Sequence, residues 1–241
     1  MLHSGKNSIR EGGQYSREEG VLTRILLADD HDAVRRGVQT MLESHPGWQV
    51  VAEAADGRTA VKLALQTKPD IAVIDLELPD LNGLEATRQI KRDMPEVEVL
   101  IYTMYETEEL IRKVFAAGAR GYVLKSDAGQ NLTEAVKALS RHKPFLTSVA
   151  SETVLESFLR SSRHDDEETV LTSREREIVQ LLAEAKSNKE IAATLCISVK
   201  TVETHRAAIM RKLGINSIVQ LVHYAIRNNL VGPSVRFAKA H

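Results

Sequence analysis

Residues 24–30 read RILLADD, an apolar run that ends in two carboxylates, Asp29 and Asp30. Three more short apolar runs end in one polar residue each: residues 71–74 in Asp75, residues 97–102 in Thr103 and residues 121–124 in Lys125. Short apolar runs that alternate with amphipathic stretches are typical of buried parallel strands. In an open α/β sheet the ligand crevice lies at the carboxyl ends of the strands. These polar residues are therefore expected to share one crevice.

This combination of carboxylates, one hydroxyl and one ammonium has a chemical logic. Clustered carboxylates stay ionised at low cost only beside a cation, and Mg²⁺ takes such oxygen ligands. A carboxylate beside that ion can attack a phosphoryl group and form an acyl phosphate. Lys125 and Thr103 can then bind the phosphoryl oxygens, one as a point charge and one as a hydroxyl donor. Helix capping or turn formation explains any single Asp better, but it does not explain the ordered set.

The stretches between these runs predict a regular alternation of strands and helices. A further strand is expected at residues 48–54. The apolar spacing predicts helices at residues 33–42, 57–66, 84–92, 106–117 and 130–140. Five βα units of this kind predict an α/β fold with a doubly wound, five-stranded parallel sheet of the flavodoxin-like type.

Several motifs also carry a resemblance: Asp29-Asp30-His31, residues 75–83 (DLELPDLNG), Thr103, and Tyr122 with Lys125. Together they resemble the receiver domain of two-component response regulators, over about residues 22–141. The resemblance implies that Asp75 accepts a phosphoryl group. It also implies a Mg²⁺ site made by the side chains of Asp30 and Asp75 and the carbonyl of Glu77, with Asp29 acting mainly through water. Ser126 stands where many receivers have a cis-Pro, so the geometry of that peptide bond stays open.

Thr103 and Tyr122 are expected to form the switch of the receiver. Thr103 should turn toward the phosphoryl group, and Tyr122 should move from an exposed to a buried position to fill the vacated space. The alternative is that Tyr122 is an ordinary half-buried strand residue. Glu77 and Tyr105 are expected to border the opening through which water reaches the acyl phosphate.

The charge distribution indicates a second domain in the chain of 241 residues. Residues 22–145 have 16 Lys and Arg against 19 Asp and Glu, residues 146–169 have 2 against 6, and residues 170–241 have 11 against 5. The net charges are therefore −3, −4 and +6, and the whole-chain value of −1 hides a basic C-terminal part. Such a part is expected of a nucleic-acid binder, although a solvated surface of no consequence also explains a modest excess.

The remaining composition favours a cytoplasmic protein. Cys196 is the only cysteine, which excludes a disulfide within the chain. Because Cys196 stands between Leu195 and Ile197, we interpret it as a small packing residue. Residues 1–21 lack the apolar core of a signal peptide and are expected to form a disordered extension. No apolar stretch is long enough to cross a bilayer, so no membrane partner is expected.

Residues 170–230 predict an all-α domain of four helices. The first is capped by Thr172 or Ser173, and the others are expected at about residues 188–195, 199–213 and 217–228. Two short helices joined by a tight turn, with the second capped and basic, describe a helix-turn-helix. The receiver would then cover residues 22–145, a linker with one helix at 148–160 would cover 146–169, and 231–241 would form a C-terminal tail.

Three segments of this domain carry a second resemblance: residues 171–175 (LTSRE), 188–192 (NKEIA) and 199–206 (VKTVETHR). They resemble the LuxR-type helix-turn-helix, which together with a receiver defines the NarL/FixJ family of response regulators. At about 100° per residue, Val202, Ile209 and Leu213 of the third helix face the core. The opposite face should enter the major groove of DNA.

The DNA-contacting residues follow from that rotation of the helix. Glu203, Thr204 and Ala207 are expected to read bases. Phosphate contacts are assigned to five residues: Lys200, Thr201, His205, Arg211 and Lys212. An ordinary solvated charge is the alternative for each Lys or Arg, and a packed histidine is the alternative for His205. Arg206 lies nearer the core side, so its role stays open.

Taken together, these features predict a DNA-binding transcription regulator, not an enzyme, that is controlled by phosphorylation of Asp75. The resemblance implies a histidine kinase as donor and a homodimer on paired DNA half-sites when phosphorylated, with RNA polymerase as a further candidate partner. One alternative is a phosphorylation-independent DNA-binding protein with a receiver-like dimerisation scaffold. The other is a phosphotransfer enzyme, which would need an acid/base group and a substrate pocket and would leave the basic second domain unexplained.

Overall fold

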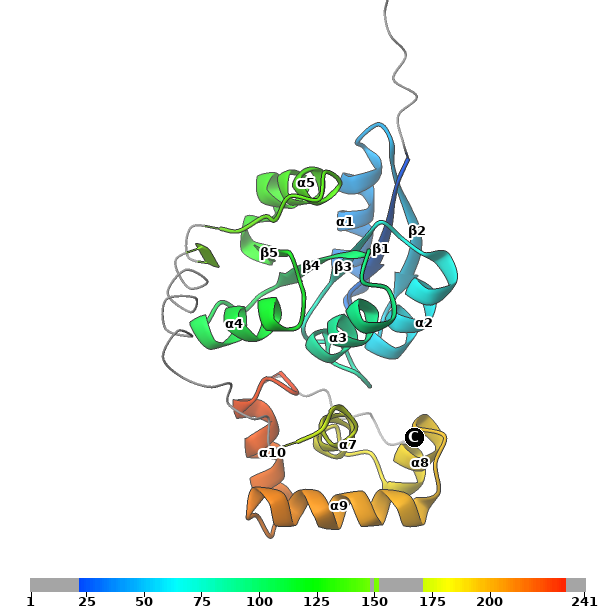
Figure 1. Ribbon diagram of the computed structural model, residues 1–241, viewed down its shortest axis with the longest axis vertical. Coiled ribbons are helices and arrows are strands. Elements are labelled where there is room, and N and C mark those ends of the chain that lie inside the picture. The colour runs from blue at the N-terminus through cyan, green and yellow to red at the C-terminus, as the bar shows by residue number, and fades with distance from the viewer. Residues whose placement is uncertain (1–21, 148–149, 152–170, 233–241) are drawn as a thin grey trace, which may run out of the picture.

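The computed structural model describes residues 22–147, 150–151 and 171–232. An α/β domain and a smaller all-α domain are stacked along the long axis of the molecule (Figure 1). The extension at 1–21, most of the helix predicted at 148–160, the polar segment at 161–169 and the tail from residue 233 lie outside the described residues.

The α/β domain has a sheet of five parallel strands: β1 (Thr23–Ala28), β2 (Trp48–Ala54), β3 (Ile71–Ile74), β4 (Glu98–Thr103) and β5 (Gly121–Leu124). Their order in the sheet is β2-β1-β3-β4-β5. Every residue of the central strand β3 is buried, which explains its uninterrupted apolar sequence. The strand order reverses between β1 and β3, and ligands bind at such switch points in doubly wound sheets.

Helices cover both faces of the sheet (Figure 1). α1 (Asp32–Glu43) and α5 (Ala128–Leu139) pack on one face, through Val38, Leu42, Leu132 and Val136. α2 (Gly57–Thr67), α3 (Gly83–Asp93) and α4 (Glu108–Ala116) pack on the other, through Ala60, Ala64, Ile90, Ile111 and Val114. The predicted α/β class and five-stranded parallel sheet are confirmed.

Capping side chains set two helix starts that differ from the predicted ones. The helix predicted from residue 106 begins at Glu108, because the Thr107 side chain accepts a hydrogen bond from the backbone N–H of Leu110. The helix predicted from residue 84 begins one residue earlier, because Asn82 caps it in the same way. This earlier start brings the helix directly up to the loop that follows β3.

The all-α domain has four helices: α7 (Ser173–Ala183), α8 (Asn188–Thr194), α9 (Val199–Leu213) and α10 (Ile218–Arg227). Thr172 is the N-cap of α7 and forms a capping box with Glu175, which decides between the two predicted caps. Apolar side chains from all four helices form one core, including Ile178, Ile191, Val202, Ile209 and Leu221. The four predicted helices are therefore present. None of the helices in the described part of the chain is both long and apolar enough to span a membrane.

The turn between α8 and α9 corrects the interpretation of Cys196. Its side chain is exposed, so it is not a packing residue. The backbone at Cys196 has φ 53°, in the left-handed region, and the neighbouring Leu195 and Ile197 fill the core instead. The sequence neighbours of Cys196 are thus apolar because they pack, whereas the cysteine itself turns outward.

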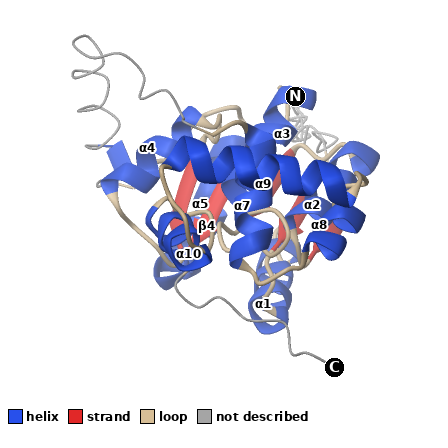
Figure 2. Ribbon diagram, turned by 90° about the horizontal axis from the view of Figure 1, so that it is seen from below, coloured by secondary structure: helices blue, strands red, loops and turns tan. Residues whose placement is uncertain are grey.

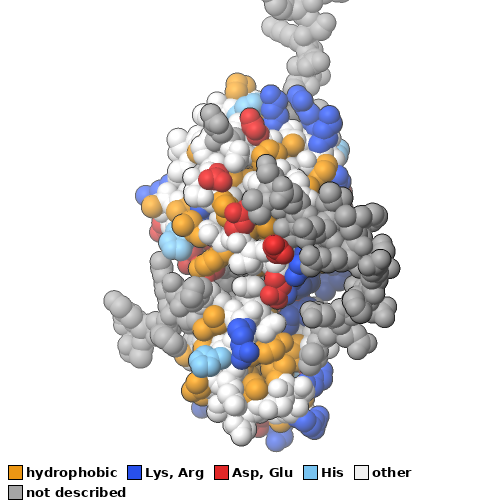
Figure 3. All heavy atoms as spheres, turned by 90° about the vertical axis from the view of Figure 1, so that its left-hand side faces the viewer, with side chains coloured by type: hydrophobic (Ala, Val, Ile, Leu, Met, Phe, Trp, Pro, Cys, Tyr) orange, Lys and Arg blue, Asp and Glu red, His pale blue; other side chains and the backbone are white. Residues whose placement is uncertain are grey.

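The two domains contact each other through α7, which lies below α2 and α3 in Figure 1. Ion pairs cross this interface between Arg58 and Glu177 and between Glu85 and Arg176. Viewed from below, the helices of the all-α domain lie over the α2–α3–α4 side of the sheet (Figure 2). On the left-hand side of Figure 1, side chains of both charges are interspersed with hydrophobic ones over both domains (Figure 3).

Candidate functional site

Parallel pairing brings the predicted polar residues to one edge of the sheet. Ala28 pairs with Ile74, and Ile74 pairs with Ile101, so β1, β3 and β4 end at nearly the same level. Asp29, Asp75 and Thr103 stand at these ends and are almost fully buried. The structure therefore gathers the residues that the sequence predicted to share a crevice.

Lys125 joins two of the carboxylates at the centre of the site. Its Nζ lies 2.7 Å from Asp29 Oδ2 and 2.7 Å from Asp75 Oδ2. Burial raises the pKa of the Asp75 carboxyl, and the Lys125 ammonium only partly offsets this. Burial acts to lower the pKa of Lys125, but the carboxylates of Asp75 and Asp29 outweigh it and the pKa is raised. Lys125 is therefore a permanent cation beside Asp75.

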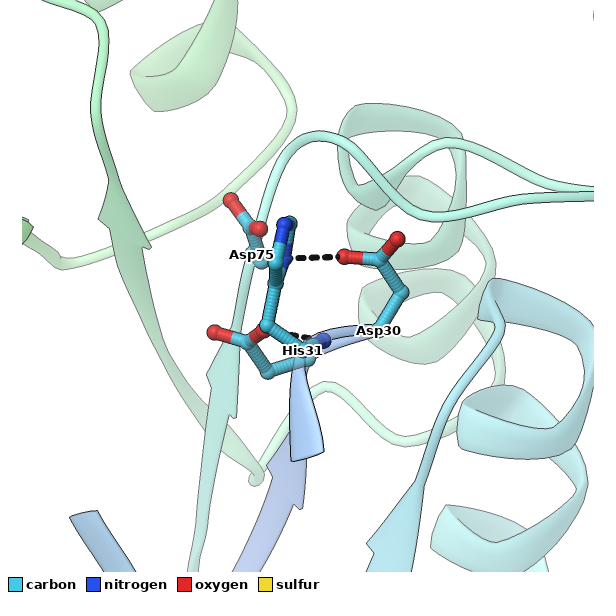
Figure 4. A group of neighbouring side chains, drawn as sticks. Asp30, His31 and Asp75 are labelled. Atoms are coloured by element: carbon cyan, nitrogen blue, oxygen red, sulfur yellow. Dashed lines mark hydrogen bonds and ion pairs between the residues drawn. The ribbon is translucent and has the colours of Figure 1, made fainter. Parts of the chain in front are cut away.

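The carboxylates lie close enough to hold one metal ion. Ligand atoms of Asp29, Asp30, His31 and Asp75 lie within 4.8 Å of one another. Figure 4 shows the His31 ring beside Asp30, with Asp75 next to them at the end of β3. The buried atoms Asp29 Oδ2 and Asp30 Oδ1 face nitrogen atoms of Lys125 and His31 at 2.7 and 2.6 Å. Carboxylate oxygens gathered in this way are the ligand type that Mg²⁺ takes.

The two switch residues are both buried. Thr103 Oγ1 accepts a hydrogen bond of 3.4 Å from the backbone N–H of Tyr105. Tyr122 is fully buried, and its hydroxyl donates to the backbone carbonyl of Tyr105. Tyr122 thus occupies the buried one of its two predicted positions, and its movement stays a prediction. The bond between Lys125 and Ser126 is trans, which answers the question left open by the sequence.

Glu77 and Tyr105 contact each other at the rim of the site. The Tyr105 hydroxyl donates to Glu77 Oε1 at 2.9 Å. Burial and the Glu77 carboxylate raise the pKa of Tyr105 to about 12, so this hydroxyl keeps its proton and remains a donor. The Glu77 side chain is therefore held by Tyr105 at the rim.

The outer face of α9 is open to solvent. A shallow groove runs along it, lined by Lys200, Glu203, Thr204, Ala207, Ala208 and Arg211. Val202 and Ile209 are buried on the opposite side, as the periodicity predicted. This agreement concerns the rotation of the helix, and the DNA contacts themselves stay predictions.

Several predicted DNA-contacting residues have partners within the domain, including Lys200, whose Nζ lies 3.6 Å from Glu203 of the same helix. Lys212 Nζ lies 2.7 Å from Glu175, in the capping box of α7, so this ion pair ties the end of α9 to the start of α7. Thr201 shares a hydrogen bond of 2.8 Å with the N-cap Ser198. His205 is half-buried on the flank of α9. To contact a DNA phosphate, Lys212 would have to share its ammonium between that phosphate and the Glu175 carboxylate.

The interdomain part of the site is not among the residues predicted from the sequence. Gln180 of α7 is 1% exposed and bonds Leu78 and Asn82, both in the loop after Asp75. Gln180 falls on a helix that was interpreted only through its apolar residues. A buried amide in the middle of a predicted amphipathic helix is the one pattern that pointed to such a contact.

Comparison with known proteins gives the same division of the chain. Residues 25–137 match the family described as "Response regulator receiver domain", and residues 169–225 match "Bacterial regulatory proteins, luxR family". The transcriptional regulatory protein LiaR of Bacillus subtilis is 38% identical over 210 residues, which are 87% of this chain and 100% of LiaR.

Two solved structures are similar as well. A LuxR-family two-component response regulator from Aurantimonas is 40% identical, with a TM-score of 0.53 over 56% of this chain and 97% of that chain. RcsB from Salmonella enterica, bound to promoter rprA in the presence of phosphomimetic BeF3-, is 28% identical, with a TM-score of 0.54 over 84% of this chain and 97% of that chain.

A receiver fold with a lysine between two buried aspartates, joined to a helix-turn-helix domain, defines a two-component response regulator. The chain belongs to the NarL/FixJ family of these regulators. It is a DNA-binding transcription regulator with a phosphorylatable receiver, in a family whose phosphodonors are histidine kinases and whose members are not enzymes.

Proposed function

We propose that Asp75 is the phosphoacceptor of this regulator and that its phosphorylation promotes homodimerisation and DNA binding through α9. The observation that supports this most is Lys125 Nζ at 2.7 Å from both Asp29 and Asp75, at the switch point of the sheet. An Asp75 carboxylate oxygen attacks the phosphorus, and the bond from phosphorus to the donor breaks. Lys125 then binds a phosphoryl oxygen, and Thr103 can donate its hydroxyl to another.

Mg²⁺ is the metal that the donor set fits. When bound, it neutralises charge on the carboxylates and on the phosphoryl oxygens. Asp30, Asp75 and the Glu77 carbonyl would hold it, with Asp29 acting through water. The clustering of ligand atoms of Asp29, Asp30 and Asp75 within 4.8 Å of one another supports this assignment.

The homodimer is supported by α10, which exposes Ile218 and Val219 by 42% and 59%. Apolar side chains exposed side by side on one helix suit a contact with a second copy. RNA polymerase is proposed as a further partner, because a transcription regulator must act on it. DNA as the target places the protein in the cytoplasm.

Genomic footprinting with and without phosphoramidate and Mg²⁺ tests the proposed function. With the donor, protection at paired sites is expected at about ten-fold lower protein concentration, a typical size for coupling between two sites. Asp75→Asn should give the pattern of untreated protein in both conditions. Equal protection with and without donor in the wild type would instead support the phosphorylation-independent alternative.

On the recognition helix α9, some residues are expected to contact DNA bases and others to contact DNA phosphates. Lys200 is 86% exposed on the groove face of α9 and should neutralise one phosphate. Lys200→Ala is therefore expected to weaken binding to all sequences alike and to flatten the slope of log affinity against log salt by about 0.9. Glu203→Ala should instead relax base preference at one position, at a cost of about 1–3 kcal/mol there.

Binding titrations across salt concentrations and operator variants measure both effects. Lys137→Ala is the matched control, because it removes the same charge from α5 in the other domain. The proposed rotation of α9 would be wrong if Lys200→Ala altered the base preference while its salt slope equalled that of the Lys137→Ala control.

A further inference from the structure

Helix α7 of the DNA-binding domain holds the backbone of the loop that follows Asp75. Gln180 Nε2 donates to the Leu78 carbonyl at 3.0 Å, and Gln180 Oε1 accepts from the backbone N–H of Asn82 at 2.7 Å. At the C-cap of α7, one turn further on, Glu184 Oε2 accepts from the backbone N–H of Asp80 at 3.3 Å. Since all three partners are backbone atoms of one loop, α7 recognises the conformation of that loop.

Two interdomain ion pairs also hold α7 against the receiver, at positions outside this loop. Arg58 of the receiver lies 2.8 Å from Glu177 of α7, whose side chain is 8% exposed. Glu85 of the receiver lies 3.1 Å from Arg176 of α7, and the Glu85 side chain is 2% exposed. Each domain contributes one acid and one base to these pairs. Glu177 and Glu85 also pair with Arg174 and Arg88 of their own helices, at 3.0 Å each, so each interdomain pair is part of a small charge network at the interface.

The segment after α10 covers the rim of the phosphoryl site. The Asn82 side-chain amide donates to the Leu230 carbonyl at 3.4 Å. Gly232 lies so close to Glu77 that an added Cβ would be 1.2 Å from Glu77 Oε1. Glu77 and Tyr105 form the rim of the site next to Asp75, so the DNA-binding domain reaches its opening.

A partly open cavity of about 500 Å³ lies between the rim and the DNA-binding domain, and it reaches Asp30 and His31, whose ligand atoms lie within 4.8 Å of those of Asp75. Asp30, His31, Glu77 and Tyr105 line it from the receiver, and Gln180, Ile226 and Leu230 line it from the DNA-binding domain. A donor such as phosphoramidate has about the volume of three waters, at about 30 Å³ each, and fits this space. A helix is about 10–12 Å across and rises about 5.4 Å per turn, so one turn of a protein donor already fills the cavity.

The docked arrangement leaves the DNA-reading face uncovered. Lys200, Thr204 and Arg211 are exposed on α9, which lies on the side of its domain away from the receiver (Figure 1). What the docking covers is the phosphoryl site rather than the recognition helix.

We propose that the docked DNA-binding domain selects the phosphodonor, admitting small donors to Asp75 through the cavity and excluding a protein-borne phosphohistidine until α7 and α10 move away. This rests on the proposed function, in which Asp75 is the acceptor. In both cases an Asp75 oxygen forms the bond to phosphorus, the phosphorus–nitrogen bond breaks, and the leaving nitrogen takes up a proton from water. The donors therefore differ in size and not in chemistry.

A reversible lock tests the proposal. Asp80 and Lys186 form a partly exposed interdomain pair at 3.6 Å, so Asp80→Cys and Lys186→Cys in a Cys196→Ser background can be bridged by a short bis-methanethiosulfonate reagent. The probes are phosphoramidate and a helical peptide with one phosphohistidine. The locked protein should keep its rate with phosphoramidate within about two-fold and lose about ten-fold or more with the peptide, the size expected when access is gated. Reductant should restore the peptide rate in the same sample.

Charge reversal gives the opposite test. Arg58→Glu places two carboxylates together at the interface and should raise the peptide rate relative to the phosphoramidate rate, and adding Glu177→Arg should reverse this. The proposal fails if the locked protein accepts phosphoryl groups from the peptide at the unlocked rate, or if locking slows both donors equally. Absence of any Mg²⁺-dependent adduct on Asp75, in every variant and with either donor, would instead refute the proposed function itself.

Discussion

Asp75→Asn is expected to abolish the phosphoryl adduct that the wild type acquires from phosphoramidate in the presence of Mg²⁺. An amide nitrogen or oxygen cannot replace the carboxylate as nucleophile, and of the residues at this edge Asp75 stands at the end of the central strand, in contact with Lys125. Intact mass measurement with and without Mg²⁺ checks the result. Asp93→Asn, at the far end of α3, is the matched control and should keep the full adduct. An adduct of unchanged size on Asp75→Asn would move the acceptor to another residue.

The same variant should not lose stability. The pKa of Asp75 is raised by burial, so the folded state favours the protonated carboxyl and the ionised form costs free energy at neutral pH. This cost sets in as pH rises from the ordinary carboxyl range through the raised pKa. A neutral amide removes this cost but also removes the charge partner of Lys125 at 2.7 Å, so without Mg²⁺ the free energy of unfolding at pH 7 should change little in Asp75→Asn. A large loss of stability would mean that the missing adduct reports misfolding.

The sheet and the acidic cluster could be predicted because each rests on local sequence patterns. Parallel strands that are buried on both faces must be apolar, and their carboxyl ends must meet at one edge. The positions of Asp29, Asp75 and Lys125 follow from these two requirements alone. The rotation of α9 follows in the same way from Val202 and Ile209, which are both fully buried.

The interdomain contact could not be predicted because it depends on tertiary packing between segments about a hundred residues apart. Gln180 bonds Asn82, yet the Asn82-Gly83 pair reads equally well as an ordinary turn and cap. Cys196 was misinterpreted for a related reason. Its apolar neighbours indicated burial, whereas the left-handed backbone of the turn directs its side chain outward.

Gly83→Ala is expected to destabilise the receiver by about 3 kcal/mol, at the upper end for overpacking of a filled site. An added Cβ at Gly83 would lie 2.0 Å from the backbone oxygen of Asp75 and 2.8 Å from its carbonyl carbon. Both are backbone atoms of the phosphoacceptor, so the clash can be relieved only by moving Asp75 or the start of α3. The rate of phosphorylation from phosphoramidate should therefore fall together with the stability.

Gly37→Ala is the matched control for this substitution. Gly37 lies within α1, and an added Cβ there meets nothing within 4 Å. Ala in place of Gly inside an exposed helix should stabilise the protein by about 0.5–1 kcal/mol. Chemical denaturation should therefore show a lower free energy of unfolding for Gly83→Ala and a higher one for Gly37→Ala, although the added side chain is the same. A Gly83→Ala protein as stable as the wild type, with unchanged phosphorylation, would show that α3 does not pack against the Asp75 carbonyl as closely as the structure places it.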